Sequence, residues 1–205
     1  MSNESVIAPP TSDRLGVLSA TAPVVRAARL VRIVPVAVEA LADAFAAQPW
    51  PEQAGLDALH FSDGTPRTAN WVLLLDALNF CFWGEPGRPR WQVEWRGQTL
   101  DGYAALAAAL TRAIAEGRPL WDAAYLAGMD EATLRDILRP VPGSPEIPLF
   151  AERRAHAREV GRVLSERYGG QFVNAVAAAG HSAPELALLL ARDFPSFADI
   201  AEWDE

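Results

Sequence analysis

The sequence predicts an all-α fold, mainly helical, with a small β-hairpin insert. Apolar residues recur at every third or fourth position over most of the chain, and this spacing gives a helix one buried face. Half of the 205 residues are hydrophobic, so a sizeable core is expected. Apolar and polar residues alternate convincingly, as in a strand, only around residues 91–95.

The N-terminal part of the chain is expected to lead into the first helices. Residues 1–20 mix proline and serine with few apolar anchors, which indicates a loose leader. Thr21 is predicted to cap the first helix, with Pro23 in its first turn, and Pro35 is predicted to open the second. Because no later segment is long enough to be a linker between independent domains, residues 21–205 are predicted to form a single α-helical domain.

Residues 71–83 are the most unusual stretch of the chain, because their apolar run contains one carboxylate and one carboxamide. The apolar positions have helical spacing, so we predict one helix that Thr68 caps and that the following Gly-Glu-Pro run ends. On such a helix Asp76, Asn79 and Trp83 would be neighbours. Polar groups beside aromatic rings suit a pocket for a flat polar molecule. The alternative is a core helix whose Asp and Asn side chains cap neighbouring backbone.

The second half of the chain is predicted to contain the hairpin and then five helices. Arg96-Gly97 supplies the turn of the hairpin. Periodicity, caps and breakers predict helices over residues 101–116, 130–138, 148–168, 172–179 and 183–193. Five charged residues of the helix over 148–168 are predicted to form a solvent-exposed stripe: Glu152, Arg153, Arg158, Arg162 and Glu166.

A second cluster of aromatic and acidic residues lies near the C-terminus, in Phe194-Pro-Ser-Phe-Ala-Asp199. A carboxylate beside phenyl rings and a proline is partly desolvated, which makes it a better base or electrostatic partner than one in open water. The alternative is structural, because Ser196 and Asp199 have the spacing of a capping pair at the start of a helix. The residues alone leave both interpretations open.

Composition disfavours several classes of function. The net charge of −8 argues against general affinity for nucleic acid. All 18 basic residues are arginine, so chemistry that needs a lysine Schiff base is disfavoured. With one cysteine and three scattered histidines, no structural metal is expected. No apolar run reaches the roughly 20 residues of a membrane span and no signal peptide is recognisable, so we expect a cytoplasmic protein.

Four segments together resemble the queuosine salvage family, the queuosine 5′-phosphate N-glycosylase/hydrolases. They are Asp76-Ala-Leu-Asn-Phe-Cys-Phe-Trp83, Gly102-Tyr-Ala-Ala-Leu106, Ile147-Pro-Leu-Phe-Ala-Glu-Arg153 and Phe194-Pro-Ser-Phe-Ala-Asp199. The resemblance implies an all-helical fold similar to the helix-hairpin-helix DNA glycosylases, and a hydrolase that needs no cofactor. Its substrate would be queuosine 5′-monophosphate, and cleavage of the N-glycosidic bond would release queuine and ribose 5-phosphate.

The resemblance also implies roles for single residues. Asp199 would be the catalytic carboxylate, facing the positive charge that develops on the ribose. The substrate-binding candidates are Asp76, Asn79, Phe80, Phe82, Trp83, His60 and Trp203. The expected partners are the nucleotide substrate and free queuine, with no membrane and no stable nucleic acid. Because the family pattern continues beyond its last motif here, the chain is expected to be shorter at its C-terminal end than the family.

Two other functions remain as alternatives. One is a glycosylase that acts on another modified nucleoside or on a DNA base, although the acidic charge of the chain speaks against binding long DNA. The other is a non-catalytic module that binds queuine. Formation of free base from the nucleotide separates a hydrolase from such a module.

Overall fold

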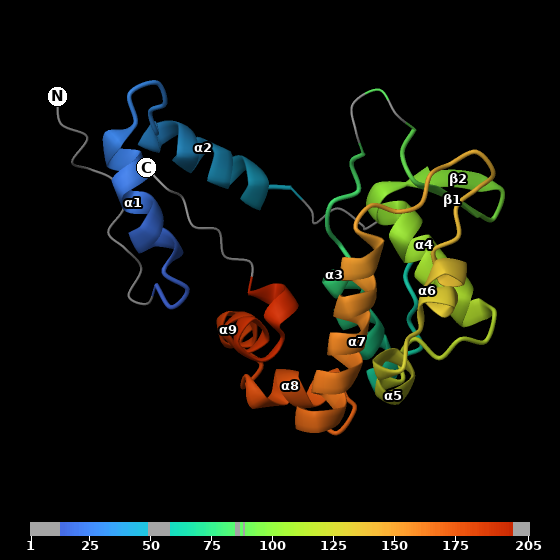
Figure 1. The fold of residues 1–205 in the computed structure, drawn as a ribbon. Helices are drawn as coiled ribbons and strands as arrows, with labels where there is room; N and C mark the ends of the chain where they lie inside the picture. The colour runs from blue at the N-terminus through green and yellow to red at the C-terminus, as the bar shows by residue number, and fades with distance from the viewer. Residues whose placement is uncertain (1–12, 49–57, 85–86, 88, 199–205) are drawn as a thin grey trace. The chain divides into compact units, whose positions relative to one another are not determined.

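A computed structural model describes residues 13–48, 58–84, 87 and 89–198 of the chain (Figure 1). Its contacts divide the chain into two units, Met1–Glu52 and Gln53–Glu205. Each unit is treated by itself, and the single domain expected over residues 21–205 stays a prediction. Among the described residues, no helix has both the length and the apolar character needed to cross a membrane.

The first unit contains two helices, α1 (Val17–Ala27) and α2 (Pro35–Ala46), and the described residues of neither are buried. The prediction for α2 is confirmed, since Pro35 lies in its first turn, where a missing N–H is harmless. The prediction that Thr21 caps α1 is wrong. Asp13 accepts hydrogen bonds from two backbone N–H groups of the first turn, so the helix begins four residues earlier than Thr21.

The second unit is mainly helical, and the fold class predicted from the sequence is confirmed (Figure 1). Its elements in chain order are α3 (Pro66–Ala77), β1 (Gln92–Trp95), β2 (Gln98–Asp101), α4 (Gly102–Ala115), α5 (Ala123–Ala127), α6 (Glu131–Ile137), α7 (Phe150–Arg167), α8 (Phe172–Ala178), α9 (Ala183–Asp193) and the 3₁₀ turn η1 (Pro195–Phe197). The likeness to helix-hairpin-helix glycosylases stays a prediction.

The two strands form the expected antiparallel hairpin, in which Gln92 lies opposite Asp101 and Trp95 opposite Gln98. The turn between them has a positive φ at both of its residues, 49° at Arg96 and 79° at Gly97. This is the two-residue turn whose twist matches that of the flanking strands. The hairpin packs against α4 and buries Val93 in the core.

The helix over the unusual stretch differs from the prediction at both ends. Thr65, not Thr68, caps α3, because its hydroxyl oxygen accepts a hydrogen bond of 3.3 Å from the backbone N–H of Arg67. The Thr68 hydroxyl instead donates to the carboxylate of Asp63 at 3.1 Å. At its other end α3 stops at Ala77, well before the expected Gly-Glu-Pro breaker.

The closest approach in the second unit joins α5 and α7. A Cβ atom placed on Gly161 would lie 2.2 Å from the backbone nitrogen of Ala127 and 2.5 Å from the carbonyl oxygen of Ala123. Only glycine fits at this crossing, and the two backbones pack directly against each other. The short helix α5 is absent from the sequence prediction, because five residues are too few to show a helical period.

We expect Gly161→Ala to destabilise the second unit by at least about 3 kcal/mol, because the added methyl group meets backbone that cannot move aside alone. The measurement is urea unfolding followed by circular dichroism. Gly128→Ala is the matched control, since its methyl group would lie at an ordinary 3.5 Å from the carbonyl oxygen of Ala124. It should change the free energy of unfolding by less than about 1 kcal/mol. Equal losses in the two variants would contradict this account of the crossing.

Candidate functional site

The residues after α3 leave the helix, so the unusual stretch is not one helical surface. Leu78 is the C-cap of α3, and Cys81 adopts a left-handed conformation with a φ of 44°. The prediction that Asp76, Asn79 and Trp83 are neighbours on a single helix is therefore wrong. The Trp83 side chain is 70% exposed, and Asn79 is also exposed.

The buried guanidinium of Arg153 explains why the helix ends at this point. It donates hydrogen bonds to the carbonyl oxygens of Leu78, Phe80 and Cys81, and through Nε to that of Pro148 at 3.0 Å. The Leu78 carbonyl also accepts from the Phe80 backbone N–H at 3.1 Å, so Arg153 is the donor on which the part-buried carbonyls of Phe80, Cys81 and Pro148 depend. The guanidinium of a helix that is distant in the sequence thus donates hydrogen bonds to carbonyl oxygens at the point where the N–H groups of a further helical turn would have done so.

Two aromatic side chains enclose the same guanidinium. Its central carbon lies 4.3 Å from the ring centre of Phe80 and 5.1 Å from that of Phe82, which is the distance range of cation–π contacts. Arg153 is 0% exposed, so its place in the predicted solvent-exposed stripe of α7 is a wrong prediction. Burial lowers the pKa of Arg153 to about 10, which keeps the group charged at neutral pH.

A polar cluster forms on the last turn of α3, where Asp76, His60 and Tyr103 gather. His60 Nε2 and the Tyr103 hydroxyl share a hydrogen bond of 2.7 Å, and the His60 ring centre lies 5.6 Å from that of the buried Trp71. We call these three residues the Asp76–His60–Tyr103 cluster. It brings together two of the predicted substrate-binding residues and adds Tyr103, which the sequence analysis did not assign to the site.

The pKa values of Asp76 and Tyr103 in this cluster depart from those of exposed side chains. The side chain of Asp76 still reaches solvent, but desolvation by the protein around it raises its pKa, an effect that the nearby charge of His60 partly opposes. Burial also raises the pKa of Tyr103, and the charge of Asp76 adds to that shift. The phenol therefore stays protonated at neutral pH, and Asp76 holds a proton more readily than an ordinary aspartate.

The Phe-Pro-Ser-Phe motif closes the described part of the chain as the turn η1. Phe194 is fully buried and its ring stacks on that of Tyr168 at 6.2 Å between centres. Ser196 does not begin a helix of its own, because both its N–H and its hydroxyl donate to the carboxylate of Glu159 on α7. Asp199 and Trp203 lie outside the described residues.

A buried carboxylate secures the end of α9 just before this motif. The Asp193 side chain is 2% exposed and accepts hydrogen bonds from the Tyr168 hydroxyl and from Arg167 and Arg192. Hydrogen bonds from Arg192 and Tyr168 hold the pKa of Asp193 well below its usual range. The network anchors the C-terminal end of α9 against the end of α7.

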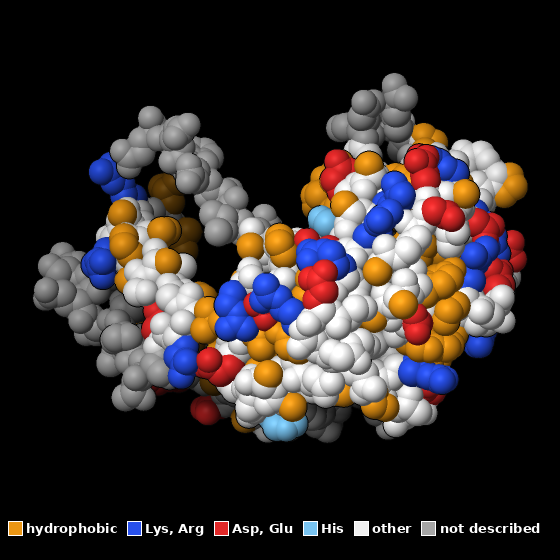
Figure 2. All heavy atoms as spheres, turned by 60° about the horizontal axis from the view of Figure 1, so that its bottom comes forward, with side chains coloured by type: hydrophobic (Ala, Val, Ile, Leu, Met, Phe, Trp, Pro, Cys, Tyr) orange, Lys and Arg blue, Asp and Glu red, His pale blue; other side chains and the backbone are white. Residues whose placement is uncertain are grey.

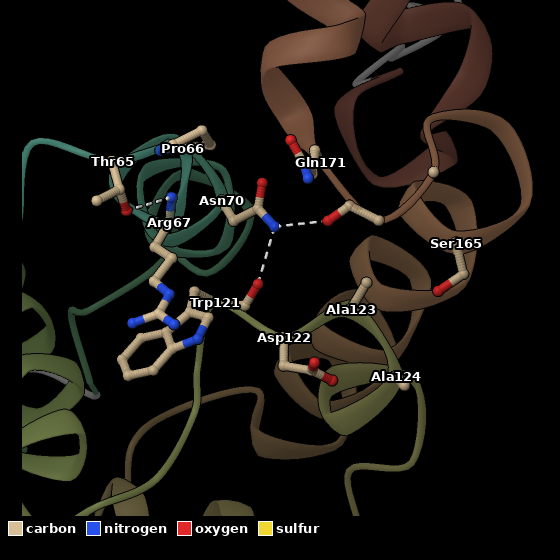
Figure 3. Close-up of a pocket in the computed structure, with 12 residues that line it drawn as sticks. Thr65, Pro66, Arg67, Asn70, Trp121, Asp122, Ala123, Ala124, Ser165 and Gln171 are labelled. Carbon is tan, nitrogen blue, oxygen red and sulfur yellow. Dashed lines mark hydrogen bonds between the residues drawn. The ribbon is translucent and has the colours of Figure 1, made fainter.

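A groove of about 890 Å³ lies elsewhere, between the start of α3, α5 and the loop before α8 (Figure 3). Its floor carries Asn70, which donates to the carbonyls of Trp121 and Gly170 at 2.8 Å and accepts from the N–H of Phe172 at 2.7 Å. None of the residues that the sequence predicts as substrate-binding lines it. Since Asn70 is fully engaged in holding three segments together, we assign the groove a structural origin.

The described segments contain no group of three or more His, Cys, Asp or Glu side chains placed to hold a metal ion. The chemistry that the second unit offers near α3 is therefore that of a carboxylate, an imidazole and a phenol, with aromatic rings on either side of a buried cation.

Comparison with known proteins gives one consistent family. The family model described as "Queuosine salvage protein" matches residues 59–205. The queuosine 5′-phosphate N-glycosylase/hydrolase of Sphaerobacter thermophilus is 49% identical over 191 residues, which cover 93% of this chain and 57% of that relative. The proteins of the same name from Mus musculus and Bos taurus are 37% and 39% identical, over 82% and 69% of this chain and 49% and 41% of their own.

The chain thus spans about half the length of the curated relatives that it matches. The resemblance that the four sequence motifs indicated is confirmed as membership of a family.

We expect Asp193→Asn to lower the free energy of unfolding at pH 7 by about 2 kcal/mol, because charge-assisted hydrogen bonds to a buried carboxylate are weakened while its exposed arginine partners stay solvated. The native pKa is lowered, so this stabilisation is present above the unfolded value of about 3.9 and is lost as the pH falls toward the native pKa.

Urea unfolding at pH 7 and pH 3 checks this expectation. The difference in free energy of unfolding between wild type and Asp193→Asn should be smaller at pH 3 than at pH 7. Glu166→Gln removes the charge of an exposed carboxylate on α7, and its free energy of unfolding should differ little from that of wild type at either pH. A gap for Asp193→Asn that is the same at both pH values would be inconsistent with this linkage.

Proposed function

Because this chain belongs to the queuosine salvage protein family, we propose that it hydrolyses the N-glycosidic bond of queuosine 5′-monophosphate and releases queuine and ribose 5-phosphate. The relatives carry this activity in their name, and the motifs on which the family resemblance rests include both acidic segments of the proposed site. The proposal extends to the cytoplasm as the place of action and to the absence of a cofactor.

The observation that carries the proposal is the Asp76–His60–Tyr103 cluster. A departing base needs hydrogen-bond donors on its edge, because its glycosidic bond breaks with negative charge building on the base. Burial moves the pKa of Asp76 upward, toward the range in which a carboxyl group can share a proton with a leaving group. We assign Asp76 and Asn79 to the base or the ribose, with His60 beside them.

The reaction itself transfers a ribosyl group to water. The bond between the ribose C1′ and the base nitrogen breaks, its electron pair stays on the base, and a bond forms between C1′ and a water oxygen. The proton that water loses balances the one that the base gains. Asp199 is assigned to the positive charge on the ribose, as a carboxylate that faces C1′.

Aromatic residues are assigned to the faces of the base. Phe80 and Phe82 are half-buried against Arg153, and Trp83 is largely exposed next to them in the chain. A flat deazapurine gains stacking energy from such rings without needing a deep pocket. Trp203 completes the set from the segment beyond the described residues.

The two alternatives are separated by simple measurements. A non-catalytic module would bind queuine but form no free base from the nucleotide. A glycosylase for long DNA would need a basic surface. Figure 2 instead shows acidic and basic side chains interspersed on one face, in keeping with exposed ion pairs such as Arg162 with Glu166 and Arg135 with Glu131. We propose that no stable complex with nucleic acid forms.

Asp199→Asn should lower kcat for release of queuine by at least about a hundredfold, because a neutral amide cannot stabilise the ribosyl cation. Chromatography of the products from queuosine 5′-monophosphate measures the rate, and circular dichroism checks that the fold is kept. Asp204→Asn makes the same charge change five residues on and should leave kcat within about threefold of wild type. Full activity of Asp199→Asn would remove Asp199 from its role, and a wild-type protein that forms no free base would refute the proposed function.

A further inference from the structure

We propose that Glu159 of α7 is a positioning residue for the reaction, which holds the segment that carries Asp199 and acts through Ser196. This inference rests on the proposed function. It concerns a residue that lies outside the sequence motifs of the family resemblance and that the sequence analysis did not single out.

The contact between the two residues is double. One carboxylate oxygen of Glu159 accepts a hydrogen bond of 3.0 Å from the backbone N–H of Ser196 and one of 2.6 Å from its hydroxyl. Both residues are half-buried, and hydrogen bonds to an ionised acceptor are about twice as strong as neutral ones. The pair therefore fixes both the backbone and the side chain of η1 at Ser196.

The same helix also holds the other segment of the proposed site, the residues that follow α3. Arg153 lies six residues before Glu159 and binds the carbonyls of Leu78, Phe80 and Cys81. Six residues along a helix separate the two side chains by roughly 9 Å of rise and about 240° of rotation. One rigid helix thus sets where the stretch after α3 lies relative to η1.

This arrangement links Glu159 to catalysis more than to stability. Asp199 follows Ser196 by only three residues, and a shift of about 1 Å in a reacting group can cost a hundredfold in rate. The fold does not depend on Glu159 to the same degree, because Phe194 is buried against Tyr168 and Asp193 is held by its own network. Loss of Glu159 should loosen η1 and leave the remainder of the second unit folded.

The test compares four variants of the full chain on queuosine 5′-monophosphate. Glu159→Ala and Ser196→Ala should each lower kcat by about 10- to 100-fold with KM changed by less than about threefold. The double variant should be no slower than Glu159→Ala, because Glu159→Ala already removes both hydrogen bonds, including the hydroxyl one that Ser196→Ala removes. Glu159→Gln should recover kcat to within about threefold of wild type, since its amide oxygen accepts the same two hydrogen bonds.

Two controls separate this role from a general loss of structure. Glu166→Ala removes an exposed acidic side chain from the same helix and should leave kcat unchanged. The rate of hydrogen exchange at the Ser196 amide should rise in Glu159→Ala but not in Glu166→Ala. This measurement does not require the protein to be active.

The outcomes distinguish the two proposals. The positioning role is overturned if wild type is active and Glu159→Ala keeps the full kcat, whether or not its KM or its thermal stability changes. Additive losses in the double variant, or a Glu159→Gln variant as slow as Glu159→Ala, overturn it as well. If wild type releases no base while the exchange of Ser196 responds as expected, the proposed function fails, and with it the role of Glu159 in that reaction.

Discussion

The second unit depends on one buried cation that no carboxylate of the described residues binds directly. The Arg153 guanidinium is fully enclosed, and carbonyl oxygens from two separate segments, together with the faces of Phe80 and Phe82, take the place of a counter-ion. Burying a charge is costly unless its hydrogen bonds are satisfied. This site is therefore stable only in the backbone conformation that brings these carbonyl oxygens to the guanidinium. The guanidinium ends α3 and directs the residues after it toward α7.

This constraint gives the proposed site its layout. Within the Asp76–His60–Tyr103 cluster, Asp76 lies on the last turn of α3, His60 precedes that helix and Tyr103 lies at the start of α4. The aromatic residues follow Asp76 in the segment bound to Arg153. On another side of α7, Glu159 holds the turn that leads toward Asp199. Two segments more than a hundred residues apart in the sequence are therefore set in relation to each other by one helix.

The sequence predicts the parts of this fold that local chemistry determines. The opening of α2 by Pro35 and the hairpin turn at Arg96-Gly97 follow from residue type and spacing, and both are confirmed. The early end of α3 and the burial of Arg153 could not be predicted, because they arise from contacts between residues more than seventy positions apart. In the site, the sequence analysis names His60 and Asp76 as binding candidates. Tyr103 lies in one of the family motifs but is given no role there, and it enters the site, as Glu159 does, only through hydrogen bonds that join distant elements.

The free energy of unfolding of Arg153→Met, compared with that of Arg158→Met, tests this account most directly. Both changes remove a guanidinium from α7, but Arg153 is buried and Arg158 is exposed. Methionine at position 153 would remove the donor from the part-buried carbonyl oxygens of Phe80, Cys81 and Pro148. The account therefore predicts a loss of at least about 3 kcal/mol for Arg153→Met and less than about 0.5 kcal/mol for Arg158→Met. Equal stability of the two variants in urea unfolding would contradict it.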